Sequence, residues 1–193
     1  MNDDQLIDQT LSGDTEAFGL LVRKYQDRLC HSLRQVLGST HDVEDVVQQA
    51  FVQAFVKLET FQRSSSFYTW IYHIAMNTAL TLRRRTAVRA VRIVDADGQV
   101  RDVADPGPAP DGRLDQQERA AQVQAALATL AEEQRAVLVL REIDGLDYEA
   151  IGEVLAIPVG TVRSRLFRAR AQFAERMKMV LQDDPTGSHP GPA

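Results

Sequence analysis

A cluster of arginines near the end of the chain is the feature of the sequence with the clearest chemistry. Four of them fall within eight positions: Arg163, Arg165, Arg168 and Arg170. Guanidinium groups bind phosphate oxygens and pair bidentately with guanine. The whole chain has a formal net charge of −5, so this positive charge is local. It indicates a nucleic-acid-binding surface rather than a generally basic protein.

The arginines lie on a predicted helix that follows a shorter helix and a tight turn. Asp147 is expected to cap the first helix, which ends near Leu155, and residues 156–160 are expected to turn the chain. We expect Thr161 to cap the second helix, which runs to about Leu181. Two helices joined in this way predict a helix-turn-helix, whose second helix enters the major groove with its first residues.

The apolar positions of this second helix predict which side chains face solvent. The expected buried face is Val162, Leu166, Ala169 and Phe173. The opposite face offers four candidates for base edges: Arg163, Ser164, Phe167 and Arg168. For phosphates we expect Arg165, Arg170, and Thr161 with the free N–H groups at the helix start. The alternative is an ordinary solvated face, but such a face would carry interspersed acids, and none occurs here before Glu175.

A second candidate site lies in residues 61–85, where aromatic rings, an amide and positive charge occur together. Residues 61–92 contain six arginines and no acidic residue. Holding an unpaired base requires a polar group for its edge, a ring to stack on and nearby positive charge. The candidates are Asn77 for the edge, Phe67, Tyr68, Trp70 and Tyr72 for stacking, and Arg63, Arg83, Arg84 and Arg85 for charge. Alternatively, the rings belong to the core and Asn77 is an ordinary surface residue.

Helical periodicity runs through nearly the whole chain, so the predicted fold class is all-α. Expected helices span about 14–37, 39–58, 66–85, 114–129, 132–143, 147–155 and 161–181. The Gly- and Pro-rich composition of residues 86–113 predicts a flexible linker. The chain is therefore expected to form two small helical domains, 1–85 and 114–182, followed by a disordered tail at 183–193.

Three segments together resemble the extracytoplasmic-function sigma factors of bacterial RNA polymerase, most closely the sigma-E type. "DGLDYEAIGEVLAIPVGTVRSRLFRAR" (144–170) is similar to the family's promoter-reading region 4. "SSFYTWIYHIAMNTALTLRRR" (65–85) resembles the promoter-opening segment of region 2, and "DVEDVVQQAFVQAF" (42–55) the polymerase-binding helix. The resemblance covers about residues 5–85 and 114–178. Motifs in the right order and at the right distance are more specific than a helix-turn-helix alone.

The resemblance implies a function in transcription initiation. Region 4 would read the −35 element as duplex through the base-edge candidates of the last helix, and region 2 would read and open the −10 element. There, Asn77 would recognise an extruded base and the loop Phe61–Phe67 would form its pocket. The helix that docks on the clamp helices of the polymerase β′ subunit would present Asp42, Glu44, Asp45, Gln48, Gln49 and Gln53. Gln49 departs from the family, which usually has an acid there.

The implied partners are core RNA polymerase, through its β′ clamp helices and β flap, promoter DNA, and an anti-sigma factor that would hold the protein inactive. A stand-alone helix-turn-helix regulator is the main alternative, but it would leave residues 61–85 without a role. We expect no enzyme, metal site, cofactor or small-molecule ligand, because no His/Cys metal spacing or phosphate-cradling Gly loop occurs.

The sequence also predicts a cytoplasmic location. Cys30 is the only cysteine, which excludes an internal disulfide. The N-terminus does not read as a signal peptide, and no run approaches the roughly 20 apolar residues that span a membrane. We therefore expect no direct membrane insertion, with attachment at the inner membrane face only through an anti-sigma factor.

Overall fold

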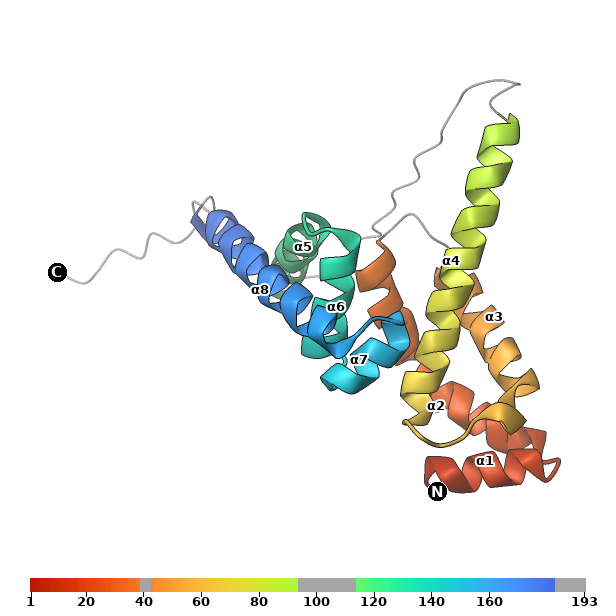
Figure 1. Cartoon of the computed structure of the whole chain (residues 1–193). Helices are drawn as coiled ribbons and strands as arrows, with labels where there is room; N and C mark the ends of the chain where they lie inside the picture. The colour runs from red at the N-terminus through yellow and green to blue at the C-terminus, as the bar shows by residue number, and fades with distance from the viewer. Residues whose placement is uncertain (39–42, 94–113, 183–193) are drawn as a thin grey trace.

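The computed structural model describes residues 1–38, 43–93 and 114–182, and within these ranges all regular structure is helical (Figure 1). The N-terminal domain contains α1 (Asp3–Leu11), α2 (Thr15–Leu37), α3 (Val43–Val56), the 3₁₀ turn η1 (Leu58–Thr60) and α4 (Phe67–Ile93). The C-terminal domain contains α5 (Leu114–Ala128), α6 (Glu132–Glu142), α7 (Tyr148–Leu155) and α8 (Val159–Gln182). The all-α prediction is confirmed. The predicted tail and residues 94–113 of the predicted linker lie outside the described residues.

Local sequence signals set most helix boundaries. The Asp14 carboxylate accepts a hydrogen bond of 3.0 Å from the backbone N–H of Glu16 and starts α2 as predicted. Gly38 ends α2 with a φ of +76°, a conformation that favours glycine. The first helix was not predicted. Its signal is a capping box in which Asn2 and Gln5 each accept a hydrogen bond from the other's backbone N–H.

Helix α4 is longer than predicted. It continues to Ile93, eight residues beyond the expected boundary at 85, so the first part of the predicted linker is helical. Residues 86–93 contain Ala and Arg, which favour helix, and residues 86–97 contain neither Gly nor Pro. The chain can therefore extend an established helix without a stop signal. Figure 1 shows this end of α4 projecting beyond the other helices.

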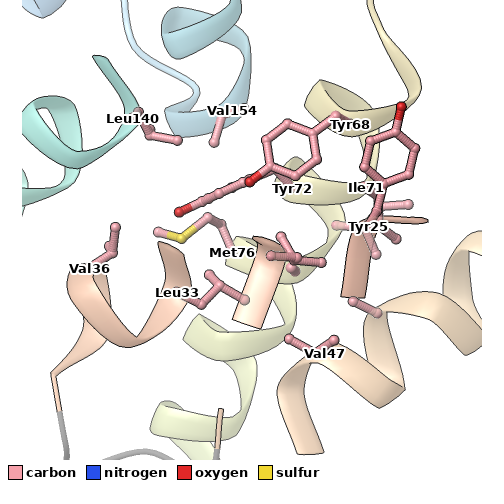
Figure 2. Close-up of a cluster of buried hydrophobic side chains, with 14 of the residues drawn as sticks. Tyr25, Leu33, Val36, Val47, Tyr68, Ile71, Tyr72, Met76, Leu140 and Val154 are labelled. Carbon is pink, nitrogen blue, oxygen red and sulfur yellow. The ribbon is translucent and has the colours of Figure 1, made fainter. Parts of the chain in front are cut away.

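The two domains share one hydrophobic core rather than meeting only through a linker. Helix α2 packs against α6, and α4 packs against α7. Figure 2 shows Leu140 of α6 and Val154 of α7 beside Tyr72 and Met76 of α4. Each domain is small, and burying apolar surface against the other enlarges the core that either could form alone. This contact between the domains was not predicted from the sequence.

Candidate nucleic-acid interface

The helix-turn-helix of the C-terminal domain forms as predicted, although the turn is shorter than the predicted 156–160 because α8 begins at Val159. Asp147 caps α7 by accepting a 2.7 Å hydrogen bond from the backbone N–H of Ala150. Ala156 turns the chain in the left-handed region, with a φ of +52°. A Cβ on Gly152 would come within 2.9 Å of the Ile157 carbonyl oxygen, so glycine is required for this tight approach. Gly160, which the prediction placed in the turn, lies inside α8.

Helix α8 presents the predicted side chains to solvent. Val162, Leu166 and Ala169 are buried and Phe173 packs against them, so the predicted inward face is confirmed. The four base-edge candidates are all exposed: Arg163, Ser164, Phe167 and Arg168. The Phe167 ring is 77% exposed, which is unusual for a large apolar side chain in the middle of a helix. One face of α8 therefore combines two guanidinium groups with a phenyl ring.

Two of the predicted phosphate-binding arginines are held by acids of α6. Arg165 pairs with Glu133 at 3.1 Å, and Arg170 contacts the Glu142 carboxylate with Nε at 2.9 Å and Nη2 at 2.6 Å. The Glu142 carboxylate raises the pKa of the Arg170 guanidinium. These ion pairs join α8 to α6, so a phosphate would have to compete with a carboxylate for either arginine.

Thr161 does not cap α8. The helix begins two residues earlier, at Val159, and the Thr161 backbone N–H donates to the Pro158 carbonyl at 2.8 Å. Pro158 has no N–H to satisfy, and its carbonyl accepts the first hydrogen bonds of the helix, from Thr161 and Val162. The predicted cap is therefore wrong, and the predicted phosphate contact would fall to the Thr161 hydroxyl and the N–H groups at the new helix start, Val159 and Gly160.

In the N-terminal domain, Asn77 lies on the exposed face of α4, where its amide is 2.9 Å from Nε2 of His73. Arg63 lies in the loop before α4 with a φ of +58° and pairs with Asp8 and, at 3.9 Å, with Asp4. The loop is therefore held against α1. Arg83 and Arg84 lie on α4, but their side chains are outside the described ones.

Most of the predicted stacking rings are inside the molecule. Phe67, Tyr68 and Tyr72 are buried, and Trp70 is half-buried with its ring 4.9 Å from that of Phe61. Burial raises the pKa of both tyrosine phenols, which keeps them protonated as hydrogen-bond donors. In this conformation the three buried rings cannot stack on a base. Among the described side chains of the predicted site, Asn77, Arg63 and the ring pair of Phe61 and Trp70 are within reach of solvent.

The predicted polymerase-binding face of α3 is largely exposed. Glu44, Asp45, Gln48 and Gln49 are exposed, whereas Gln53 is half-buried and donates to the Thr78 hydroxyl at 3.0 Å. Asp42 lies outside the described residues. Beside this face, α2 and α3 enclose a groove of about 980 Å³ whose apolar lining is Phe18, Val22, Val47, Phe51, Val52 and Phe55.

The apolar character of this surface was not predicted. Phe55 is 43% exposed, and Val52 and Val56 are exposed as well. Their outward positions on an otherwise polar helix were the available signal. The C-terminal domain has a second groove, of about 700 Å³, lined mainly by Val123, Leu127, Leu138, Val139, Ile143 and Phe173. Both grooves suit apolar side chains of a protein partner.

Other classes of site find no structural support in residues 1–38, 43–93 and 114–182. Within these ranges, no three His, Cys, Asp or Glu side chains gather as metal ligands would. Cys30 is half-buried and carries a free thiol. Among the same described helices, none combines the length and apolarity needed to cross a membrane.

Comparison with known families and proteins agrees with the two domains. Residues 21–89 match the family model "Sigma-70 region 2", and residues 120–173 match "Sigma-70, region 4". The RNA polymerase sigma-H factor of Pseudomonas aeruginosa is 36% identical over 190 residues, which cover 94% of this chain and 96% of that one. The ECF RNA polymerase sigma-E factor of Escherichia coli K12 is 35% identical over 191 residues, covering 94% and 97%.

Two solved structures have the same arrangement of helices. CnrH, solved in complex with the cytosolic domain of CnrY, superposes with a TM-score of 0.64 at 28% identity, covering 94% of this chain and 98% of CnrH. RpoE of Bartonella quintana, solved with the anti-sigma factor NepR, gives a TM-score of 0.65 at 27% identity, covering 83% and 96%. Both similarities extend across the two domains.

Proposed function

Because the chain belongs to the extracytoplasmic-function sigma factors of bacterial RNA polymerase, we propose that it binds core polymerase, directs it to promoters with −35 and −10 elements, and promotes opening of the DNA. Sigma factors are transcription initiation factors rather than enzymes. The proposed site of action is the cytoplasm, where polymerase and promoter DNA are.

The observation that carries this proposal is the exposed face of α8. Arg163, Phe167 and Arg168 project from a helix start that a tight turn presents to solvent. Within the described residues, neither arginine pairs with a carboxylate, in contrast to Arg165 and Arg170 on the same helix. Guanidinium groups free of carboxylate partners can pair with guanine, and the phenyl ring can contact a thymine methyl. This face, with Ser164, is the proposed reader of the −35 duplex.

The proposed −10 reader lies at the start and middle of α4. Asn77 can both donate to and accept from a base edge, and its only recorded side-chain partner among the described residues is His73. Trp70 and the loop Phe61–Phe67 supply the rim of the proposed base pocket. Tyr68 and Tyr72 would contribute only if the domains separate, whereas the Phe67 ring packs on Tyr25, Phe61 and Trp70 of its own domain. Arg63, Arg83 and Arg84 would supply positive charge toward the strand backbone.

The proposed polymerase contacts use the two grooves and the charges beside them. Asp42, Glu44, Asp45, Gln48, Gln49 and Gln53, with the α2/α3 groove, form the proposed docking surface for the β′ clamp helices. The groove of the C-terminal domain is the proposed site for the β flap. Exposed apolar side chains such as Val52 and Val56 support partner binding, because covering them with a partner lowers the free energy of the complex.

We also propose control by an anti-sigma factor. CnrH and the Bartonella quintana RpoE, which this chain resembles across both domains, were each solved with a protein bound, and NepR is named as an anti-sigma factor. A partner that covered the same apolar grooves would compete with polymerase. Such a partner, if anchored in the membrane, would hold the chain at the inner membrane face.

Reconstituted transcription tests the proposal. Core polymerase with this chain should produce a specific transcript from a template carrying −35 and −10 elements of this family, and core alone should not. An Arg168→Ala chain should reduce the transcript, whereas Arg176→Ala, a change at an exposed arginine further along α8, should not. A chain that binds −35 duplex but neither co-elutes with core nor stimulates it would instead be a stand-alone regulator.

A further inference from the structure

A buried carboxylate links the two domains. Asp144 lies between α6 and α7 in the C-terminal domain, and its side chain is 1% exposed. Its oxygens accept hydrogen bonds from Ser32 of α2 and from the Tyr68 phenol of α4, the latter at 2.7 Å. Arg28 of α2 lies 3.5 Å from the carboxylate and donates to the Asp144 carbonyl at 2.6 Å. All of these side-chain partners belong to the N-terminal domain.

The number of hydroxyl protons determines which group donates each hydrogen bond in this network. Ser32 has one hydroxyl proton, which goes to the Asp144 carboxylate because a carboxylate only accepts. The Tyr72 phenol, 2.7 Å from the same hydroxyl, must therefore donate to Ser32. The Arg28 guanidinium also stacks over the Tyr68 ring at 4.0 Å. The hydrogen bonds thus run from Tyr72 and Ser32 on one side, and from Tyr68 on the other, to a single acceptor.

A carboxylate is costly to bury unless its partners are in place, and losing one partner leaves charged or polar groups unsatisfied. Here the partners are in place only while the domains touch. Since the Asp144 side chain has no partner from its own domain among the described residues, it is not needed to build that domain. Its hydrogen bonds instead stabilise one relative placement of the two domains.

That placement covers two rings of the proposed −10 reader and contacts its loop, whereas Asn77 stays exposed. Tyr68 and Tyr72 are buried in it, and Ser65, within the loop Phe61–Phe67, donates to the Glu153 carboxylate of α7 at 2.9 Å. Domains of about 85 and about 70 residues have radii of gyration of about 12 and about 11 Å, so touching domains lie roughly 30 Å apart between centres. Promoter elements about 25 base pairs apart lie about 85 Å apart along the duplex. The closed chain cannot bind both elements at once.

We propose that Asp144 is a latch that keeps the free chain closed, so that the chain inhibits its own −10 reader until the domains separate on polymerase. The role of the latch in initiation rests on the function proposed above, whereas the closed state itself does not. The two related structures with this arrangement of helices were each solved with a protein bound, so measurements on the partner-free chain decide whether Asp144 alone holds it closed.

The test compares Asp144→Asn and Ser32→Ala with Glu149→Gln in the full chain. Glu149 is exposed on α7, so its change removes the same charge without touching the network. By small-angle scattering, the first two chains should have a larger radius of gyration than wild type, and Glu149→Gln should not. We expect the open-to-closed ratio to rise about ten- to hundredfold. Circular dichroism checks that each chain keeps its helices. If the Asp144→Asn chain loses helical structure, the scattering result for Ser32→Ala tests the latch instead.

An Asp144→Asn or Ser32→Ala chain that keeps its helices and stays as compact as wild type would overturn the latch, whatever its DNA binding. A second measurement separates the latch from the proposed function. Without polymerase, the opened chains should bind single-stranded −10 DNA more tightly than wild type, by about the same factor, with −35 duplex affinity unchanged. Expansion without this gain would support the latch and count against the −10 assignment.

A reversible crosslink tests the need for opening. Cysteines at Gln35 of α2 and Gln124 of α5, in a Cys30→Ser chain, can be joined by a short cleavable crosslinker, because the two side chains are in contact and lie outside the proposed binding surfaces. The joined chain should lose promoter-specific transcription with core polymerase and regain it on cleavage. Equal transcription before and after cleavage would show that opening is not required and would overturn the inhibitory role.

Discussion

The two proposed DNA readers differ in how much of each is exposed. On α8, the base-edge candidates project from a convex helix surface, and the opposite face of the helix is buried in the core. On α4, Asn77 is exposed but most of the rings around it belong to the core shared with the other domain. Reading a duplex needs only a rigid convex helix that fits a groove. Capturing an unpaired base needs a concave site lined by rings, which this placement of the domains keeps covered.

The first prediction, with the largest expected effect, concerns the contrast between the buried and the exposed faces of α8. Leu166→Ala should destabilise the protein by about 2–5 kcal/mol, because Leu166 is 2% exposed and its removal leaves a cavity. Its neighbour Phe167, which is exposed, is the matched control, and Phe167→Ala should change stability by less than about 0.5 kcal/mol. Urea unfolding measures both. Comparable losses of stability would mean that Phe167 belongs to the fold rather than to a DNA-binding face.

The next prediction concerns −35 recognition. Arg168→Ala should weaken binding to a −35 duplex by about 1–3 kcal/mol if the guanidinium pairs with a guanine, and should relax preference at one base position. Arg176→Ala removes an exposed guanidinium from the same helix and should weaken binding far less. Fluorescence anisotropy with matched and single-substituted duplexes distinguishes them. A uniform loss across all duplexes would assign Arg168 to phosphate contact instead.

Sequence reasoning succeeded for most of this domain because its signals are local, although the cap predicted at Thr161 was wrong. The cap of α7 and the inward face of α8 depend on residues within a few positions of one another. The same reasoning failed where contacts join distant segments. Asp144 stands in an Asp-Gly pair that is typical of a surface turn, yet its partners Arg28 and Tyr68 lie 116 and 76 residues away. Periodicity could show that Tyr72 lies on an apolar face, but not that a second domain would cover it.

The third prediction separates the two readers. Asn77→Ala should leave −35 duplex binding unchanged and slow promoter opening, by about tenfold if one good base contact worth about 1–2 kcal/mol is lost. Thr81→Ala, one turn further along the exposed face of α4, is the control. Permanganate reactivity of unpaired thymines follows opening. The division of labour between α4 and α8 would be refuted if Asn77→Ala and Arg168→Ala each impaired both steps to the same extent.

The smallest expected effect concerns polymerase binding by α3. Gln49 is exposed, and the sequence resemblance predicts an acid at its position, so Gln49→Glu should strengthen core binding by less than about 1 kcal/mol. The gain should shrink as salt is raised, because an exposed ion pair is screened. Gln48→Glu adds the same charge one residue away and distinguishes a specific contact from general attraction. Equal gains from both changes would indicate only that the clamp surface is basic. A gain confined to Gln49→Glu would identify this glutamine as the residue that lowers the affinity of the chain for core polymerase.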